Sequence, residues 1–152
     1  MGETSKEVEV RDEQGRLTGR FQLADGRLHG PCTLYSAGRV IAEISYAHGQ
    51  REGEMRSYGE NAELGSIVPH HADLPDGEAR YFHPDGGIAR VANFREGRLH
   101  GEVRDYAPDG KLLSLTKYID GKVQAEEQAG AGPAPAPGPA AGKSWLARLV
   151  EG

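Results

Sequence analysis

Glycine recurs along this chain with a period of 23 or 24 residues, and this period limits what the chain can fold into. One series of glycines consists of Gly30, Gly53, Gly77 and Gly101. Two further series share the period and each lapses once; they run Gly15, Gly38, Ala62, Gly86, Gly110 and Gly26, Gly49, Asp73, Gly97, Gly121. Glycine adopts a positive φ at the least steric cost. The pattern therefore predicts an array of small units rather than a large layered core.

The pentapeptide Gly-Arg-Leu-His-Gly occurs at residues 26–30 and again at 97–101, 71 positions apart. Both copies fall at the same point of the period, three units from each other. We interpret them as the same turn rather than as a duplicated catalytic motif. His29 and His100 are accordingly expected to be turn residues.

Within each unit, apolar or small residues alternate with polar ones, as in Val40, Ala42, Ile44 and Tyr46. A period of two is typical of a half-buried β-strand. The alternating segments are separated by turn sequences such as His-Pro-Asp-Gly at 83–86, whose residues favour a tight hairpin turn. The sequence therefore predicts an all-β fold over residues 1–123, a single-layer antiparallel meander of about four and a half repeated β-hairpins.

The two faces of these strands differ in composition. Cys32 shares a column with Met55, Ala79 and Val103 and is expected to be buried. The other face repeats the order Glu, Arg, aromatic, and its arginines are Arg56, Arg80 and Arg104. We interpret this column either as a charged ladder that keeps the sheet soluble or as a stripe on which a partner protein docks.

Composition excludes several classes of function. The 18 basic and 23 acidic residues give a net charge of −5, which provides no basic footprint for nucleic acid or an anionic membrane. The single cysteine excludes an internal disulfide framework. The first 15 residues lack the apolar region of a secretory signal, and no apolar run approaches the roughly 18 residues of a membrane span. We expect a cytoplasmic protein.

Catalytic and metal-binding patterns are weak. No pair of carboxylates, and no serine or cysteine, has a spacing that indicates catalysis, so we expect no enzyme activity and no cofactor. The only cluster of candidate metal ligands is His70, His71, Asp73 and Asp76. Adjacent histidines on a strand point to opposite faces, so we expect no metal site. Because the third unit lapses at Ala62 and Asp73, we expect a bend or an irregular loop at 69–75.

The composition changes abruptly at Gln124. Residues 124–143 are rich in alanine, proline and glycine and are expected to form a disordered linker. Residues 144–152 are predicted to form a short amphipathic helix. Its candidate partner-binding residues are Trp145, Leu146, Arg148, Leu149 and Val150. This segment either is a frayed terminus, packs back as a cap on the sheet, or docks on another protein.

The segment 25–30, together with Tyr35, Gly38, Tyr46 and their later copies, resembles the bacterial variant of the MORN repeat. That family is often labelled YwqK-type antitoxin, and the resemblance covers about residues 23–122. It implies a β-hairpin array that binds a partner without catalysis, with family roles in toxin neutralisation, scaffolding and, in eukaryotic relatives, lipid contact. The family shares no catalytic residues.

Two main hypotheses about function follow, beside a third and weaker one, an enzyme with a site in the irregular third repeat. In the first, the chain is a non-catalytic protein-binding module, an immunity or antitoxin-like protein whose sheet binds a partner such as a toxin. In the second, it is an adaptor or cargo protein docked by its C-terminal peptide to a shell, secretion or scaffold component. An edge-to-edge homodimer also stays open, because the edge strands carry unpaired backbone groups.

Overall fold

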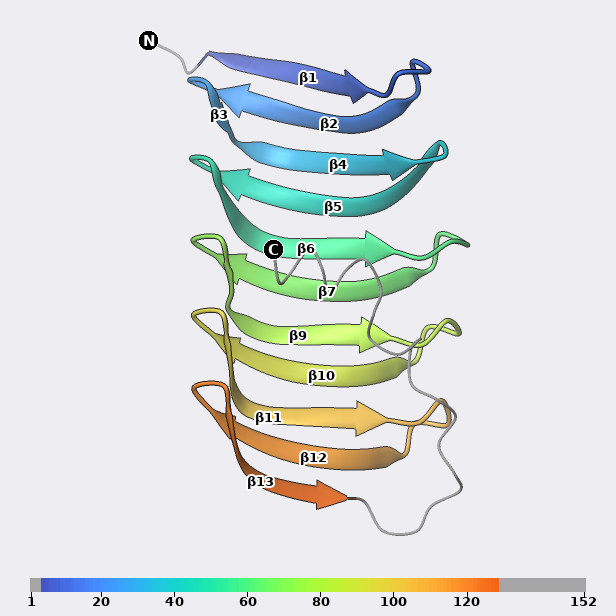
Figure 1. Cartoon of the computed structure of the whole chain (residues 1–152), viewed down its shortest axis with the longest axis vertical. Helices are drawn as coiled ribbons and strands as arrows, with labels where there is room; N and C mark the ends of the chain where they lie inside the picture. The colour runs from blue at the N-terminus through green and yellow to red at the C-terminus, as the bar shows by residue number, and fades with distance from the viewer. Residues whose placement is uncertain (1–3, 129–152) are drawn as a thin grey trace.

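The computed structural model describes residues 4–128, and within them the chain forms one antiparallel sheet without a helix. The predicted single-layer meander of hairpins is confirmed (Figure 1). The strands are β1 (Ser5–Arg11), β2 (Leu17–Ala24), β3 (Arg27–Leu28), β4 (Gly30–Ser36), β5 (Arg39–Ala47), β6 (Gln50–Tyr58), β7 (Leu64–His71), β8 (Leu74–Pro75), β9 (Gly77–Phe82), β10 (Ile88–Arg95), β11 (Arg98–Tyr106), β12 (Leu112–Ile119) and β13 (Lys122–Gln128).

The strand order follows the chain, so neighbours in sequence are neighbours in the sheet. The main path runs β1-β2-β4-β5-β6-β7-β9-β10-β11-β12-β13, with β3 beside β2 and β8 beside β7. Figure 1 shows the strands bowed along their length, with the hairpin turns gathered at the two ends of the strands. β1 and β13 are the two edges of the described sheet.

At one end of the strands, five two-residue turns connect successive hairpins. The turns are Asp25-Gly26, His48-Gly49, Ala72-Asp73, Glu96-Gly97 and Asp120-Gly121. The first residue of each turn has φ between 48° and 51°, and the second has φ between 71° and 84°. Two consecutive positive φ values define the type I′ turn, whose twist matches that of the flanking strands.

Each of the later turns is hydrogen-bonded to the unit before it. The amide of the second turn residue donates to a backbone carbonyl of the preceding turn region, as in Gly49 N to Leu28 O (2.8 Å) and Gly121 N to Leu99 O (2.7 Å). Asp73 N bonds Arg51 O and Gly97 N bonds Pro75 O in the same way. These four bonds form a ladder, which we call the turn ladder, along one end of the array.

The duplicated pentapeptide is explained by a second set of bonds beside the turn ladder. His29 Nδ1 accepts a hydrogen bond from His48 N at 3.3 Å, and His100 Nδ1 accepts one from Asp120 N at 3.2 Å. Carboxylates take the same role in the intervening units, where Glu52 accepts from Ala72 N and Asp76 accepts from Glu96 N. The two histidines occupy equivalent positions, but the expectation that they are turn residues is wrong, because His29 lies between β3 and β4 and His100 lies within β11.

Glycines of the first series begin a strand or lie within one, and each is opposite a larger side chain of the neighbouring strand. Gly101 pairs with Tyr118, and Gly77 pairs with Phe94. Gly101 has φ 105°, and an added Cβ would lie 3.4 Å from Asn93 Cβ. A side chain at Gly101 would therefore strain the backbone and crowd its neighbour.

The core lies on one side of the single sheet, which we call the packed face. Its central row runs across the strands, and each member pairs with the next one on the neighbouring strand. Ile44 pairs with Met55, for example, and Met55 pairs with Val68. The side chains of this row are at most 7 % exposed; they are Cys32, Ile44, Met55, Val68, Ala79, Ala92 and Val103. The predicted burial of Cys32 is thus confirmed. Burial also raises the pKa of its thiol, which keeps the sulfur protonated and unreactive.

A buried hydroxyl pair continues the packed face towards the longer turns. Ser57 and Ser66 face each other across β6 and β7, and their oxygens are 2.8 Å apart. Both residues are at most 1 % exposed, so each hydroxyl depends on the other for a hydrogen bond.

The third unit is regular, and the expectation of a bend or irregular loop at 69–75 is wrong. Strand β7 pairs with β6 from Leu64 to His70, and a type I′ turn follows. Ala62 and Asp73 adopt φ of 62° and 71°, in the places where other units have glycine. The carboxylate of Asp73 accepts a 2.8 Å bond from Arg51 N, which helps to offset the strain of its backbone.

The predicted linker begins too early at residue 124. Residues 124–128 belong to β13, which pairs with β12 through Thr116–Glu126 and Leu115–Glu127. The segment 121–126, Gly-Lys-Val-Gln-Ala-Glu, is a degraded copy of 97–102, Gly-Arg-Leu-His-Gly-Glu, and so starts a further unit. The rest of the predicted linker and the predicted helix at 144–152 lie outside the described residues.

The acceptor role of His29 gives a testable prediction. His29→Ala leaves the amide of His48 without its partner and is expected to lower the free energy of unfolding by about 1 kcal/mol. His29→Glu is expected to cost less, because Glu52 performs the same role one unit later. Urea denaturation of the two variants measures this difference, and equal losses would contradict the role of the side-chain acceptor.

Candidate partner-binding face

Opposite the packed face lies a surface on which three strands repeat the same order of side chains. Strands β6, β9 and β11 carry the segments 54–58, 78–82 and 102–106, each with Glu, Arg and an aromatic residue at alternate positions. We call this surface the charged face. Alternation along a strand places all three side chains of a segment on the same side of the sheet.

The register of the sheet aligns the three arginines in one row. Ile67 pairs with both Arg56 and Arg80, and Val91 pairs with both Arg80 and Arg104. Consecutive arginines are therefore two strands apart, which corresponds to about 10 Å. The structure thus brings together the three arginines that the sequence singled out, in a row that alternates with aliphatic side chains.

Each arginine is paired within its own strand. Arg56 lies 3.5 Å from Glu54, Arg80 lies 3.2 Å from Glu78, and Arg104 contacts Glu102 at 2.5 Å. The three arginine side chains retain about half of their exposure, at 48 %, 51 % and 47 %. Exposed pairs of this kind contribute roughly 0–1 kcal/mol to stability, so little energy is lost if a partner rearranges them.

Aromatic rings border the arginine row. Tyr58, Phe82 and Tyr106 are half-buried and pair with Leu64, Ile88 and Leu112 across the strand. The hydroxyl of Tyr58 donates a 2.9 Å bond to Glu43, and the pKa of Arg104 is raised by its contacts with Tyr106 and Glu102. Arginine and aromatic side chains are the residue types enriched in protein interfaces.

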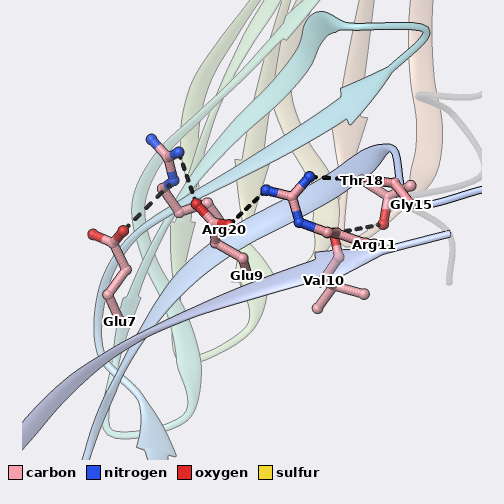
Figure 2. A network of polar contacts seen from close by, with 7 residues as sticks. All are labelled: Glu7, Glu9, Val10, Arg11, Gly15, Thr18 and Arg20. Carbon is pink, nitrogen blue, oxygen red and sulfur yellow. Dashed lines mark hydrogen bonds and ion pairs between the residues drawn. The ribbon is translucent and has the colours of Figure 1, made fainter.

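A fourth arginine, which the repeating Glu-Arg-aromatic order does not include, lies in the same row. Arg20 on β2 pairs across the sheet with Glu9 and Thr33. Figure 2 shows its guanidinium between Glu9, at 3.0 Å, and Glu7, at 3.6 Å, while Arg11 binds the other side of Glu9. These contacts raise the pKa of Arg20 and lower that of Glu9. The alternation Glu-Val-Glu-Val-Arg at 7–11 was the signal that could have revealed this network.

A shallow depression lies between Arg20 and Arg56 along the arginine row. It has a volume of about 410 Å³, and its lining includes Thr33, Glu43, Glu54 and Arg56. The depression is open and polar, so it suits a side chain of a macromolecular partner better than an enclosed small molecule.

The candidate metal ligands of the third unit are separated by the sheet. His70 is 4 % exposed on the packed face, where its Nδ1 donates to Val68 O at 3.0 Å. His71 is exposed and its Nδ1 bonds Glu52 at 2.6 Å. Within residues 4–128, no three histidine, cysteine or acidic side chains are grouped closely enough to hold a metal ion.

His70 is the polar residue of the packed face with the least complete hydrogen bonding. It occupies the place of Tyr46, Phe94 and Tyr118 in the other units, and its Nε2 is buried without a hydrogen-bond partner. Burial lowers the pKa of His70, an effect that its bond to Val68 O partly opposes. The bond to Glu52 instead raises the pKa of His71.

The predicted binding residues of the C-terminal segment, Trp145, Leu146, Arg148, Leu149 and Val150, lie outside the described residues. The described part of the chain holds no helix of the length and apolarity needed to cross a membrane.

The geometry defines the class of protein, an open array of β-hairpin repeats stacked through their turns. The family model described as the MORN repeat variant matches residues 75–96 and 99–120. Each match begins after one type I′ turn and ends at the first residue of the next, so it covers one unit. Residues 75–96 and 99–120 are thus similar to the MORN repeat variant, which supports the resemblance seen in the sequence. No curated protein matches the chain.

MORN repeats are in general modules that bind proteins or membranes, and the family is a non-enzymatic one. The described array is consistent with a non-catalytic repeat protein.

His70 and His71 are predicted to have opposite effects on how the free energy of unfolding depends on pH. The pKa of His70 is lowered on folding, so the unfolded state binds the proton more readily below its usual value of 6.5. The free energy of unfolding is therefore expected to fall as the pH drops below about 6.5. His70→Phe, which restores the residue type found at Phe94, is expected to reduce this acid sensitivity.

His71 serves as the matched control. Its pKa is raised on folding, so its contribution is present at low pH and disappears as the pH rises through the folded-state value. His71→Gln is accordingly expected to steepen the loss of stability on acidification. Denaturation curves between about pH 7.5 and pH 5 measure both effects, and a His70→Phe profile parallel to the wild type would contradict the assignment.

Proposed function

We propose that this chain is a non-catalytic protein-binding module that contacts its partner through the charged face. The observation that carries the proposal is the row of Arg56, Arg80 and Arg104, repeated at intervals of about 10 Å and bordered by aromatic rings. Guanidinium groups bind carboxylates in a directional way, and flanking aromatic side chains provide apolar area beside them.

The spacing of the row adds selectivity to the proposed contact. A partner that engages all three arginines needs acceptor groups at matching intervals of about 10 Å. A partner with the wrong spacing leaves a guanidinium or a carboxylate unpaired, which is unfavourable. An immunity or antitoxin-like role in the cytoplasm, in which the array occupies the surface of a toxin, is the biological function we infer.

The alternative function is that of an adaptor or cargo protein docked by its C-terminal segment to a shell, secretion or scaffold component. The feature that favours it is the apolar peptide around Trp145, the only tryptophan of the chain, which follows a segment rich in proline and alanine. In this alternative the array is what is delivered, and the charged face acts as a soluble surface.

Capture of partners by three tagged forms of the chain separates the two functions. The forms are the full chain, the variant Arg56→Ala/Arg80→Ala/Arg104→Ala, and a truncation that ends at Gln128. The truncation stops there because removal of residues 124–128 would delete most of β13 and disturb the sheet. Bound proteins are identified by mass spectrometry and their affinity is measured with purified components.

We expect the triple variant to lose affinity for the partner at least about tenfold, whereas the truncation retains it. A matched control, Arg27→Ala/Arg39→Ala/Arg98→Ala, removes the same charge from exposed sites outside the arginine row and is expected to bind normally. Loss of binding on truncation alone would replace the proposal by the adaptor function. Equal binding by the triple variant and the wild type would refute the role of the charged face.

A further inference from the structure

We propose that the charged face binds the same face of a second copy of the chain, which forms a two-fold symmetric dimer. This inference rests on the proposed function of the charged face as a binding surface, and it adds a second copy of the chain as an occupant that competes with another partner protein for that surface. It follows from the arrangement of opposite charges in two parallel rows, a feature of the sheet that neither the repeat period nor the family match describes.

The two rows run across the strands side by side. One contains Glu54, Glu78 and Glu102, and the other contains Arg56, Arg80 and Arg104. In each segment the glutamate precedes the arginine by two residues, so the rows are about 7 Å apart. Over β6, β9 and β11 each row carries charges of one sign at intervals of about 10 Å, and Lys117 of β12 ends the glutamate row with a positive charge.

Consider a two-fold axis that is parallel to the rows and lies midway between them. Rotation about this axis places the arginine row of one copy over the glutamate row of a facing copy, and the glutamate row over the arginine row. Such an axis leaves the position along the array unchanged. Arg80 of one copy then lies over Glu78 of the other, and Glu78 lies over Arg80 of the other. The same exchange holds for the segments of β6 and β11, so the surface is complementary to itself, as an isologous interface requires.

Apolar side chains between the charges provide the driving force for such a contact. Ile67, Val91 and Leu115 alternate with the arginines along their row, and all three are half-buried in the single chain. Burial of this apolar area favours association, while the opposed charges fix the register of the two sheets.

The area of the face is sufficient for a reversible dimer. The face extends from β6 to β12, which spans six strands of the main path, or about 29 Å at the usual strand spacing. Segments of five residues give a width of about 17 Å, so each copy contributes about 500 Å² and the pair about 1,000 Å². This value is at the lower end of specific interfaces, which predicts a dimer that dissociates on dilution.

The sheet edges are less suited to pairing two copies. If β1 paired with itself in antiparallel fashion around Val8, Glu7 would lie opposite Glu9, and like charges directly opposite each other are unfavourable. At the other edge, all seven residues of β13 are exposed. Glu126 pairs with Thr116, so it places a charge in the central row of the packed face. Charged edge strands are a known means of preventing edge-to-edge association.

Sedimentation equilibrium of the full chain and of charge-reversed variants tests the proposal. Arg80→Glu places two glutamates opposite each other at both symmetry-related positions, and Glu78→Arg does the same with two arginines. Each variant alone is expected to weaken the dimer at least about tenfold. Both side chains are about half exposed, so the variants are expected to fold, which circular dichroism verifies.

The decisive measurement mixes the two single variants in equal amounts. The Arg80→Glu chain then presents carboxylates at both positions, and they face the two guanidinium groups of the Glu78→Arg chain. We expect this heterodimer to have about the affinity of the wild-type dimer. The double variant Glu78→Arg/Arg80→Glu, which exchanges the rows at the central strand, is expected to dimerise with itself. The matched control Arg98→Glu lies outside the rows and is expected to leave the dimer intact.

Three results would overturn the inference. They are a wild-type chain that stays monomeric up to about 1 mM, a dimer that neither single variant weakens, and single variants that are not rescued when mixed. The proposed function is tested separately by capture of another protein. If the chain is monomeric but Arg56→Ala/Arg80→Ala/Arg104→Ala abolishes that capture, the charged face is still a binding surface. Only the second copy is then ruled out as its partner.

Discussion

The fold depends on backbone that enters the left-handed region at regular intervals and donates hydrogen bonds to the preceding unit. In a type I′ turn both central residues have positive φ, so their amides point away from their own hairpin. From the second turn onward these amides bond a main-chain carbonyl and a side-chain acceptor of the unit before, as Gly49 and His48 do with Leu28 and His29. Each hairpin is therefore stabilised by its neighbour, which is the behaviour of a quasi-one-dimensional repeat protein.

Much of the fold could be predicted from the sequence because its determinants are local and repeat. The glycine period indicated the turns, and the alternation of side chains indicated the two faces and the burial of Cys32. The third unit could not be predicted in this way, since the lapse at Asp73 is compensated by a contact with Arg51, 22 residues earlier. The boundary at 124 was wrong because composition concealed a degraded repeat in β13.

The candidate site was predictable in part for the same reason. The order Glu, Arg, aromatic is visible in the sequence, but the alignment of Arg56, Arg80 and Arg104 through Ile67 and Val91 is a property of the register. Arg20 belongs to the same row and was missed, because its carboxylate partners lie on β1, outside the repeating pattern. Self-complementarity of the two charged rows likewise becomes visible only once the strands are placed side by side.

The turn ladder has a direction. Every one of its bonds has its donor in the later unit and its acceptor in the earlier one, from Gly49 and Leu28 to Gly121 and Leu99. A duplicated stretch of two dozen residues would therefore find its acceptors already in place and would offer an equivalent set to the unit that follows. In evolution such a chain can lengthen by whole hairpins, and each added first strand of the Glu-Arg-aromatic type would extend the recognition surface by one more step.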